Sequence, residues 1–360
     1  MKNLNIIDNS GKLFYVGGVV RDELLSRESF DVDIVYEGNA IEHCSCLGEV
    51  VRVNPDFGTV RVKIGDEEVD FASTRSEIYP RPGHLPVVEK IGCSLKEDVL
   101  RRDFTVNSLA KSLKTGEIVD YTGGLEDLKA GVLRVLHDKS FIDDPTRIIR
   151  ALKFSVRFGF RLEENTRRLQ EEYLANINYD VCYKRIKKEV METLNLNSQE
   201  AFERFYDEGI YKLVSPVEVR RPRVDAVAIV EALGVNMPWL VYAGGLDLSR
   251  LELTKVEQRI LKDFMEIRGR SLKTDFEIYK AFSPVALETI ALYGVWVSKE
   301  PVERYLKIKD IKISVTGDDL LALGIKPSKQ YVEIFDAVLK EKLKNPQMTK
   351  DEEIKFLLTL

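Results

Sequence analysis

The sequence predicts an α+β protein, with a mixed sheet in the first 140 residues and an all-helical remainder. Two observations support this prediction. Short runs rich in β-branched and aromatic residues, separated by Gly, Pro and Asn, fill the first part of the chain and are typical of strands joined by turns. From residue 146 onward, apolar residues recur every three or four positions, which indicates amphipathic helices. A chain of 360 residues is long enough for two or more domains.

The β-rich part also contains a first helix and one long connection. Residues 20–26 carry the first helical pattern. Residues 78–92 contain three prolines and two glycines, so we expect a mobile loop there. The predicted strands are residues 13–16, 33–36, 50–53, 59–64 and 68–72.

The helical part begins after a Pro at position 145. Ile148, Leu152 and Val156 form one apolar stripe. Gly159 is expected to end this helix, because glycine readily adopts the left-handed conformation of a helix C-terminus. Further helices are predicted at residues 186–194, 201–213, 225–233, 255–267, 276–282 and 329–343.

The distribution of charge is more informative than its total. A net charge of −5 argues mildly against a nucleic acid partner, because phosphates are neutralised by Lys and Arg. Between residues 147 and 168, however, seven basic residues stand against two acidic ones, and further basic residues follow at 184–188. Such a track is usually a solvated surface, but next to a phosphate site it favours RNA binding.

Cysteine, histidine and hydropathy patterns exclude several classes of protein. The four cysteines lack CxxC pairing, and the three histidines lack metal-ligand spacing. We find neither a signal-peptide core nor an apolar run of membrane-spanning length. We therefore expect a cytoplasmic protein with reduced thiols and no membrane partner.

Two glycines and two aspartates form the most informative motif. In 16-VGGVVRD-22, Gly17 and Gly18 open a helix and leave backbone N–H groups bare, which suits a polyphosphate. Asp31 and Asp33 are two residues apart, so on a strand both carboxylates leave the same face. Such a pair favours a bound cation, and a nucleoside triphosphate arrives with Mg²⁺. The combination predicts a nucleotidyltransferase site.

Two further motifs support this prediction and carry a family resemblance. They are 101-RRDFTVN-107 and 143-DDPTRIIRALKFSVRFGF-160. With these motifs the chain resembles the class II tRNA nucleotidyltransferase (CCA-adding enzyme) and bacterial poly(A) polymerase family. The resemblance is clear over residues 13–160, where it includes 120-DYTGGLEDL-128. It is weaker at 185-RIKKEV-190 and faint beyond residue 195, except at 317-GDDLLALGIKP-327.

The resemblance implies a head with the nucleotidyltransferase (polymerase β-like) fold, followed by an all-α neck, body and tail. The implied domains are a catalytic head at residues 1–140, a neck with the nucleotide-reading helix at 141–195, a body at 196–265 and a tRNA-binding tail at 266–360.

The resemblance also implies two-metal chemistry with Mg²⁺ as the cofactor. Asp31 and Asp33 would hold the metals, and a third carboxylate would come from a neighbouring strand. Asp70, within 69-VDFASTR-75, fits the family pattern, and Glu68 is the alternative on the same strand face.

Residues of both 16-VGGVVRD-22 and 101-RRDFTVN-107 are expected to bind the nucleotide. Arg21 offers a fork for phosphate oxygens, or else pairs with Asp22. Arg102 and Asn107 would contact the sugar and phosphates, with Asp103 orienting Arg102.

Asp144 and Arg147 are expected to read the incoming base. Asp144 would cap a helix whose first residue is Pro145, which makes Asp144 and Arg147 neighbours on one helix face, with Arg150 one turn further. A carboxylate and a guanidinium together match the Watson–Crick edges of cytosine and adenine and reject uracil. Two departures from the family are Asp143 in place of Glu and Lys153 in place of Arg, so Lys153 is a weaker candidate for the triphosphate.

The expected function is template-independent addition of C, A or both to the 3′ end of tRNA, using CTP and ATP. The acceptor stem and T arm would be bound by shape and backbone. A poly(A) polymerase, or an enzyme restricted to A or to CC, stays open as an alternative, as does a small-molecule nucleotidyltransferase. Candidate phosphate contacts for RNA are Arg157, Arg161, Arg185 and Lys188.

Overall fold

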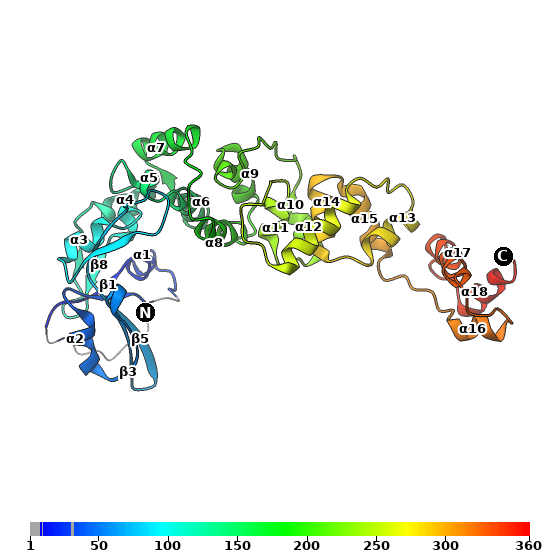
Figure 1. The fold of residues 1–360 in the computed structure, drawn as a ribbon, viewed down its shortest axis with the longest axis horizontal. Helices are drawn as coiled ribbons and strands as arrows, with labels where there is room; N and C mark the ends of the chain where they lie inside the picture. Colours follow the sequence, from blue (N-terminus) through cyan, green and yellow to red (C-terminus); the bar gives the residue numbers. More distant parts are fainter. Residues whose placement is uncertain (1–7, 9, 30–31) are drawn as a thin grey trace. The chain divides into compact units, whose positions relative to one another are not determined.

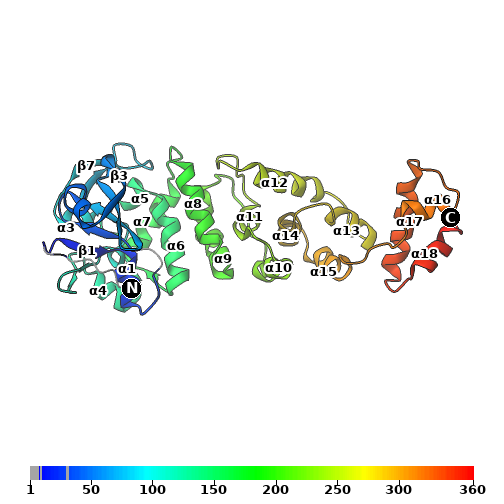
Figure 2. The ribbon, with the colours of Figure 1, turned by 90° about the horizontal axis from the view of Figure 1, so that it is seen from below.

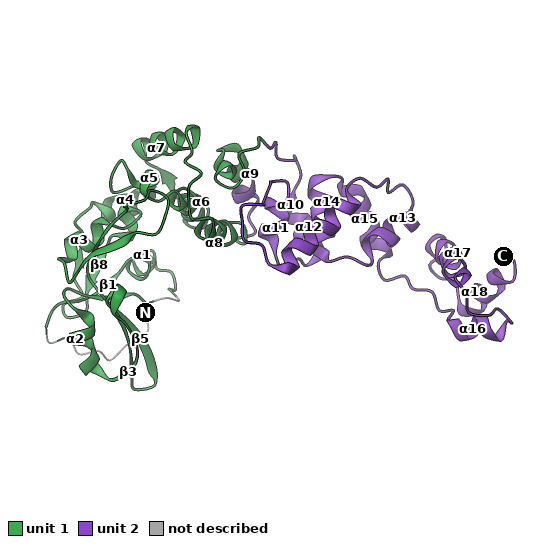
Figure 3. Ribbon diagram, in the orientation of Figure 1, with its two compact units in different colours: residues 1–196, 203–218 green, residues 197–202, 219–360 purple. Residues whose placement is uncertain are grey.

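The computed structural model describes residue 8, residues 10–29 and residues 32–360 (Figure 1). The chain divides into two compact units, shown in different colours in Figure 3. The first comprises Met1–Leu196 and Glu203–Glu218, and the second comprises Asn197–Phe202 and Val219–Leu360. The finer boundaries at residues 140 and 265 stay predictions.

A seven-stranded mixed sheet forms the framework of the first unit, in the order β3-β4-β5-β2-β1-β8-β9 among the described residues. Only β2 and β5 run parallel, and the other neighbours are antiparallel. The predicted strands are all present, whereas β8 and β9 were not predicted. The bounds are β1 (Leu13–Val16), β2 (Ile34–Tyr36), β3 (Glu49–Asn54), β4 (Thr59–Ile64), β5 (Glu67–Ser73), β8 (Ala110–Ser112) and β9 (Ile118–Val119).

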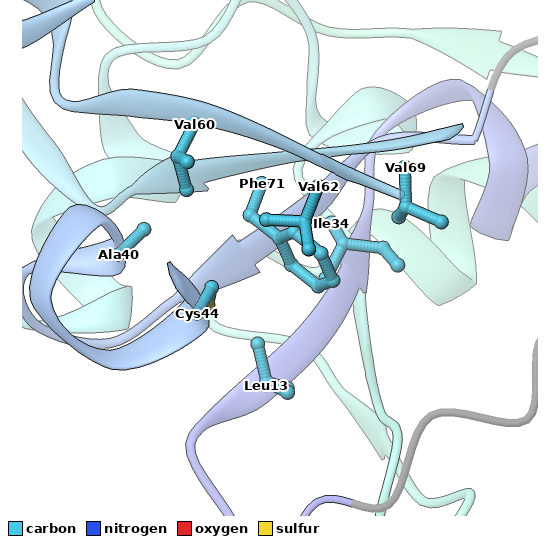
Figure 4. Close-up of a cluster of buried hydrophobic side chains, with 8 residues drawn as sticks. All are labelled: Leu13, Ile34, Ala40, Cys44, Val60, Val62, Val69 and Phe71. Atoms are coloured by element: carbon cyan, nitrogen blue, oxygen red, sulfur yellow. The ribbon is translucent and has the colours of Figure 1, made fainter. Parts of the chain in front are cut away.

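Alternation along the strands gives the sheet two different faces. On one face, apolar side chains from β1, β2, β4 and β5 pack against α2 (Ala40–Cys44), as Figure 4 shows. On the other, Phe14, Val16 and Val35 pack with Leu95 and Val99 of α3 (Leu95–Leu100). Further along this second face, Arg61 of β4 and Asp70 of β5 are exposed and can line a site.

The expectation of a mobile loop at residues 78–92 is wrong for most of this stretch. β6 (Arg75–Ile78) and β7 (Val87–Ile91) pair as an antiparallel hairpin. The connection between them is itself held in place, because the amide of Gly83 donates to the Asp143 carbonyl (3.0 Å) and the Gly83 carbonyl accepts from the amide of Cys182 (3.0 Å). The prolines mark only this connection, where the chain leaves the ladder.

Helices α6 and α8 form the helical side of the first unit and lie side by side in Figures 1 and 2. α6 (Thr146–Phe158) ends at Gly159, which has φ 73°, as predicted. α8 (Tyr183–Leu194) begins three residues earlier than expected. The other helices of the first 196 residues are α1 (Gly18–Leu24), α4 (Gly124–Ala130), α5 (Ser140–Asp143) and α7 (Glu164–Ala175).

Beyond residue 196 the described chain is helical, as predicted, although several helices were missed. The predicted helix at 201–213 is broken by Gly209, whose φ of 73° separates α9 (Gln199–Asp207) from the turn Ile210–Leu213. None of the helices in the described part of the chain has the length and apolar character that a membrane crossing requires. The remaining helices are α10 (Ala226–Leu233), α11 (Pro238–Ala243), α12 (Lys255–Ile267), α13 (Asp275–Phe282), α14 (Leu287–Trp296), α15 (Lys299–Ile308), α16 (Gly317–Ala322), α17 (Gln330–Lys344) and α18 (Lys350–Leu357).

The close packing around Gly83 leads to a testable prediction. Gly83 has φ 81°, and a Cβ placed on it would lie 2.6 Å from Cγ1 of Val181. Gly83→Ala should therefore lower the free energy of unfolding by about 2–3 kcal/mol and expose the 79–86 connection to protease, because conformational strain and a clash add.

Gly65→Ala is the matched control, because Gly65 also has positive φ (63°) but nothing lies within 4 Å of its Cβ position. It should cost about 1 kcal/mol through strain alone. Chemical denaturation and limited proteolysis measure both effects. Equal destabilisation of the two variants would contradict the docking of this connection.

Candidate active site

A cavity of about 1060 Å³ in the first unit gathers most of the residues predicted to bind a nucleotide. Its walls come from the β1–α1 turn, the segment after α3, and helices α6 and α8. Asp31 lies outside the described residues. The predicted residues that line the cavity are Gly17, Gly18, Arg21, Asp33, Arg102, Asp103, Asn107, Asp144, Arg147, Arg150, Lys153, Arg157, Arg185 and Lys188.

The β1–α1 turn brings the chain close to two guanidinium groups. Gly17 has φ 71°, and a Cβ there would lie 2.8 Å from Nη1 of Arg102, so the turn requires glycine. Arg21 is buried, and its guanidinium donates to Asp22 (2.8 and 2.6 Å) and to Asn107. The alternative in which Arg21 pairs with Asp22 is thus observed, although Arg21 also lines the cavity.

Asp103 supports Arg150, and the prediction that it orients Arg102 is wrong. Its Oδ2 accepts two hydrogen bonds from Arg150 (2.8 and 2.7 Å), and its Oδ1 accepts one from Asn107 (3.0 Å). Arg102 instead pairs with Asp98 at 3.1 Å. The physical reason is helical spacing, because Asp98 stands four residues before Arg102 at the end of α3.

The surroundings of Asp103 keep its carboxylate ionised. Burial alone would raise the pKa of Asp103, but the positive charge of Arg150 and the hydrogen bond from Asn107 outweigh it and lower the pKa to about 2. Arg150 also donates to Glu189 at 3.2 Å, and it stays protonated because these two carboxylates raise its pKa. This pairing connects the segment after α3, helix α6 and helix α8.

The side chains of Asp144 and Arg147 reach the same cavity but pair with other groups, and only the backbone joins the two residues, by a bond from the Arg147 amide to the Asp144 carbonyl (3.1 Å). The carboxylate of Asp144 accepts from the amide of Thr146 (3.2 Å), where α6 begins, one residue later than predicted. Its other oxygen pairs with Arg185 at 2.5 Å. Arg147 donates instead to the hydroxyl of Ser140 (2.6 Å) and to the carbonyl of Arg101 (3.0 Å).

The four candidate RNA contacts are in different positions. Arg185 lines the first cavity and pairs with Asp144, and its contact with RNA phosphates stays a prediction. Arg157 and Lys188 line the same cavity. Arg161 lies outside it, in β11 (Arg161–Leu162), and its RNA contact stays a prediction.

Sequence reasoning missed the acidic side chains that α8 contributes. Lys153 donates to Glu189 (2.7 Å) and to Glu192 (2.6 Å). Tyr79, from the docked connection, also lines the cavity, with the Arg147 guanidinium 6.0 Å from its ring centre. The run 185-RIKKEV-190 was the one signal that could have placed Arg185 and Glu189 here.

Asp33 and Asp70 meet on the open face of the sheet. Ile34 pairs with Phe71 in the parallel ladder, so the residues before them are neighbours. Both aspartates line a second cavity of about 550 Å³. Asp70 accepts two hydrogen bonds from Arg61 (2.8 and 2.7 Å), whereas the nearest oxygen of Glu68 is 3.5 Å from Arg61.

Carboxylate oxygens are ligands that Mg²⁺ prefers, so this donor set is suitable for the metal. Within the described residues, no group of three or more His, Cys, Asp or Glu side chains is close enough to hold a metal ion. The described part of the site therefore offers two carboxylates, one of which Arg61 already neutralises.

Comparison with known proteins agrees with this geometry. The model of the poly(A) polymerase head domain matches residues 13–134. A CCA-adding enzyme of Leuconostoc mesenteroides is 35% identical over 352 residues, which cover 89% of this chain and 86% of that protein. An A-adding tRNA nucleotidyltransferase of Aquifex aeolicus is 51% identical over 168 residues, which cover 45% of this chain and 20% of that protein.

Other relatives match nearly the whole chain. An A-adding tRNA nucleotidyltransferase of Geobacter sulfurreducens is 31% identical over 97% of this chain but only 45% of its own length. The chain thus spans a fifth of the Aquifex protein and less than half of the Geobacter protein. The structure of the Thermotoga maritima CCA-adding enzyme with tRNA superposes with a TM-score of 0.71 at 26% identity, covering 97% of this chain and 91% of that one.

The ionised state of Asp103 predicts a pH-dependent stability difference. A folded-state pKa of about 2, below the ordinary value, means that the charged carboxylate stabilises the fold above about pH 4 and loses this effect as the pH falls towards 2. Asp103→Asn should lower the free energy of unfolding by about 2 kcal/mol at pH 7.

Denaturant titrations of both proteins at several pH values measure this difference. It should shrink steadily below pH ~4, because the wild-type carboxylate is then becoming neutral as well. A difference that is the same at neutral and acidic pH would contradict the charged interaction with Arg150.

Proposed function

The chain belongs to the class II tRNA nucleotidyltransferase and bacterial poly(A) polymerase family, and we propose that it adds C, A or both to the 3′ end of tRNA from CTP and ATP. The observation that carries this proposal is the convergence of four separate motifs on one cavity of nucleotide size. The reaction is attack of the RNA 3′-hydroxyl on the α-phosphorus, with pyrophosphate as the leaving group.

The cationic side chains of the cavity would bind the triphosphate. The Arg102 guanidinium lies beside Gly17 and the Arg21 guanidinium beside Gly18, so phosphate oxygens at this turn could approach both groups. Lys153 lies further along the cavity and is held by Glu189 and Glu192. A triphosphate would compete with these carboxylates for the Lys153 ammonium group.

Asp33 and Asp70, together with Asp31, would hold Mg²⁺. Bound there, the metal would lower the pKa of the RNA 3′-hydroxyl and neutralise charge on the triphosphate. Arg61 keeps the charge of Asp70 balanced and its carboxylate oriented along the open face of the sheet.

Asp144 and Arg147 would select the base. Cytosine and adenine share an exocyclic amino group, which a carboxylate accepts, beside a ring nitrogen, which a guanidinium can donate to. Arg185 fixes Asp144, while Ser140 and the Arg101 carbonyl fix Arg147, so both groups are positioned before a base arrives. Uracil presents an oxygen to the carboxylate and would be rejected.

Addition of A alone is a narrower candidate. The relatives from Aquifex, Geobacter and Halalkalibacterium halodurans are all named A-adding enzymes, and the last is 29% identical over 96% of this chain. The connection at residues 79–86 is present, and its docking beside Asp143 supports a role near the base. Such an enzyme would act in the cytoplasm, where it would bind the acceptor stem and T arm of tRNA.

Three tRNA transcripts test the proposed function. They end before CCA, after C and after CC, and each is incubated with Mg²⁺ and labelled CTP or ATP. A CCA-adding enzyme extends all three, an A-adding enzyme extends only the CC transcript with ATP, and a poly(A) polymerase adds many A residues. If no transcript is extended, the proposal is wrong.

Asp33→Ala is the matched control for chemistry in this assay. Loss of a metal-binding carboxylate should reduce nucleotide addition by at least about a thousandfold, while tRNA affinity and the unfolding midpoint change little. Activity above a few per cent of wild type would rule out Asp33 as a metal ligand.

Asp144→Asn tests base selection. The amide can still accept from Thr146, but it can turn a donor towards O4 of uracil. The ratio of kcat/KM for CTP or ATP over UTP, measured with the transcript that the wild type extends, should fall about tenfold to a hundredfold. An unchanged ratio would show that Asp144 does not select the base and serves only the structure, through its bonds to Thr146 and Arg185.

A further inference from the structure

The open face of the sheet carries a row of charged side chains across four neighbouring strands. Arg52 of β3 pairs in register with Arg61 of β4, and Arg61 pairs with Asp70 of β5. Asp70 in turn adjoins Asp33, the residue before β2. All four residues line the second cavity, which is separate from the wall formed by α6 and α8.

A β-bulge puts Arg52 into this row. Val50 pairs with Val62, and a regular ladder would then place Arg52 opposite Val60, on the apolar face. The register shifts between Val50 and Arg52, which brings Arg52 beside Arg61 instead. A bulge that re-aims one charged side chain towards a cavity is typical of a binding surface.

An exposed aromatic ring lines the first cavity, and residues on either side of it in the chain line the second. Phe57, in the turn that joins β3 to β4, is 47% exposed and lines the first cavity. Asn54 and Thr59, on either side of the same turn, line the second. The Arg75 guanidinium lies 5.7 Å from the Phe57 ring centre, and Arg75 borders both cavities.

We propose that the second cavity binds the 3′-terminal nucleotide of the RNA acceptor, with Arg52 and Arg61 on its backbone phosphate. The base would reach past Arg75, which borders both cavities, to the Phe57 ring of the first cavity. This inference rests on the proposed function. In-line transfer requires the attacking hydroxyl and the pyrophosphate on opposite sides of the α-phosphorus. With the triphosphate beside Gly17 and Arg21, the hydroxyl has to approach past Asp33, and the second cavity opens there.

The chemistry of this cavity fits a single-stranded RNA end. Guanidinium groups bind phosphodiesters, and unstacked bases stack on aromatic rings with little sequence preference. Arg52 forms no ion pair with any residue that the structure describes, so its charge is available to a phosphate. Arg61 would exchange one of its bonds to Asp70 for a phosphate oxygen when RNA and metal bind together.

Arg52→Ala and Phe57→Ala test the proposal, with Lys63→Ala as the matched control. Lys63 is exposed and basic on the same strand as Arg61, two residues along, but it lines neither cavity. We compare the affinity of each full-length variant for the transcript ending in CC and for the same transcript without its single-stranded 3′ end. ATP affinity is measured separately without RNA.

The wild type should prefer the transcript with the 3′ end, and each test variant should lose about fivefold to tenfold of that preference. In Arg52→Ala, which changes a residue outside the first cavity, the salt dependence of RNA binding should fall by about one phosphate contact and ATP affinity should stay within about twofold. Lys63→Ala should retain the preference.

Two outcomes would overturn the assignment. Either both test variants keep the preference for the 3′ end, or the ATP affinity of Arg52→Ala falls as much as its RNA affinity, which would make the second cavity part of the triphosphate site. Failure of the proposed function is a separate result, because it appears as a wild type that extends none of the transcripts.

Discussion

The partly buried ion pair between Asp103 and Arg150 is the interaction on which the site depends. It joins the segment after α3 to helix α6, and the bond from Arg150 to Glu189 extends the connection to α8. These three walls of the first cavity thus each include a charged group that is neutralised by another of the three. Burying these charges has a high desolvation cost, which only close pairing and several hydrogen bonds offset. The cavity is therefore well defined only when all three segments are in place.

This arrangement explains why a chain with a net charge of −5 can present a strongly basic cavity. Four of its basic side chains are fixed by carboxylates, so they are positioned before a ligand arrives: Arg21 by Asp22, Arg102 by Asp98, Arg150 by Asp103, and Lys153 by Glu189 and Glu192. A triphosphate brings more negative charge than any one carboxylate. Under the proposed function, a bound triphosphate would compete with the α8 carboxylates for the Lys153 ammonium group.

The sheet contributes in a different way, through register. Because β2 and β5 are parallel neighbours, two aspartates from segments almost forty residues apart lie next to each other. The antiparallel ladders then add Arg61 and Arg52 to the same row. Apolar residues at the alternate positions form the core in Figure 4, so the same strands support both the fold and the charged surface.

The sequence alone determined the elements and the chemical groups of the site. Alternation found β1 to β5, the i, i+4 stripe found α6, and the Gly pair and charged motifs found most of the cavity lining. Helix α14 was not predicted, because it is buried almost all round and lacks the polar face that an amphipathic pattern requires. Only the tertiary structure decided the ion-pair partners. Asp103 pairs with Arg150 rather than with its neighbour Arg102, and Asp144 pairs with Arg185 rather than with Arg147 on its own helix. Spacing along a helix says which residues share a face, but not which charge from a distant segment will lie opposite them in the folded chain.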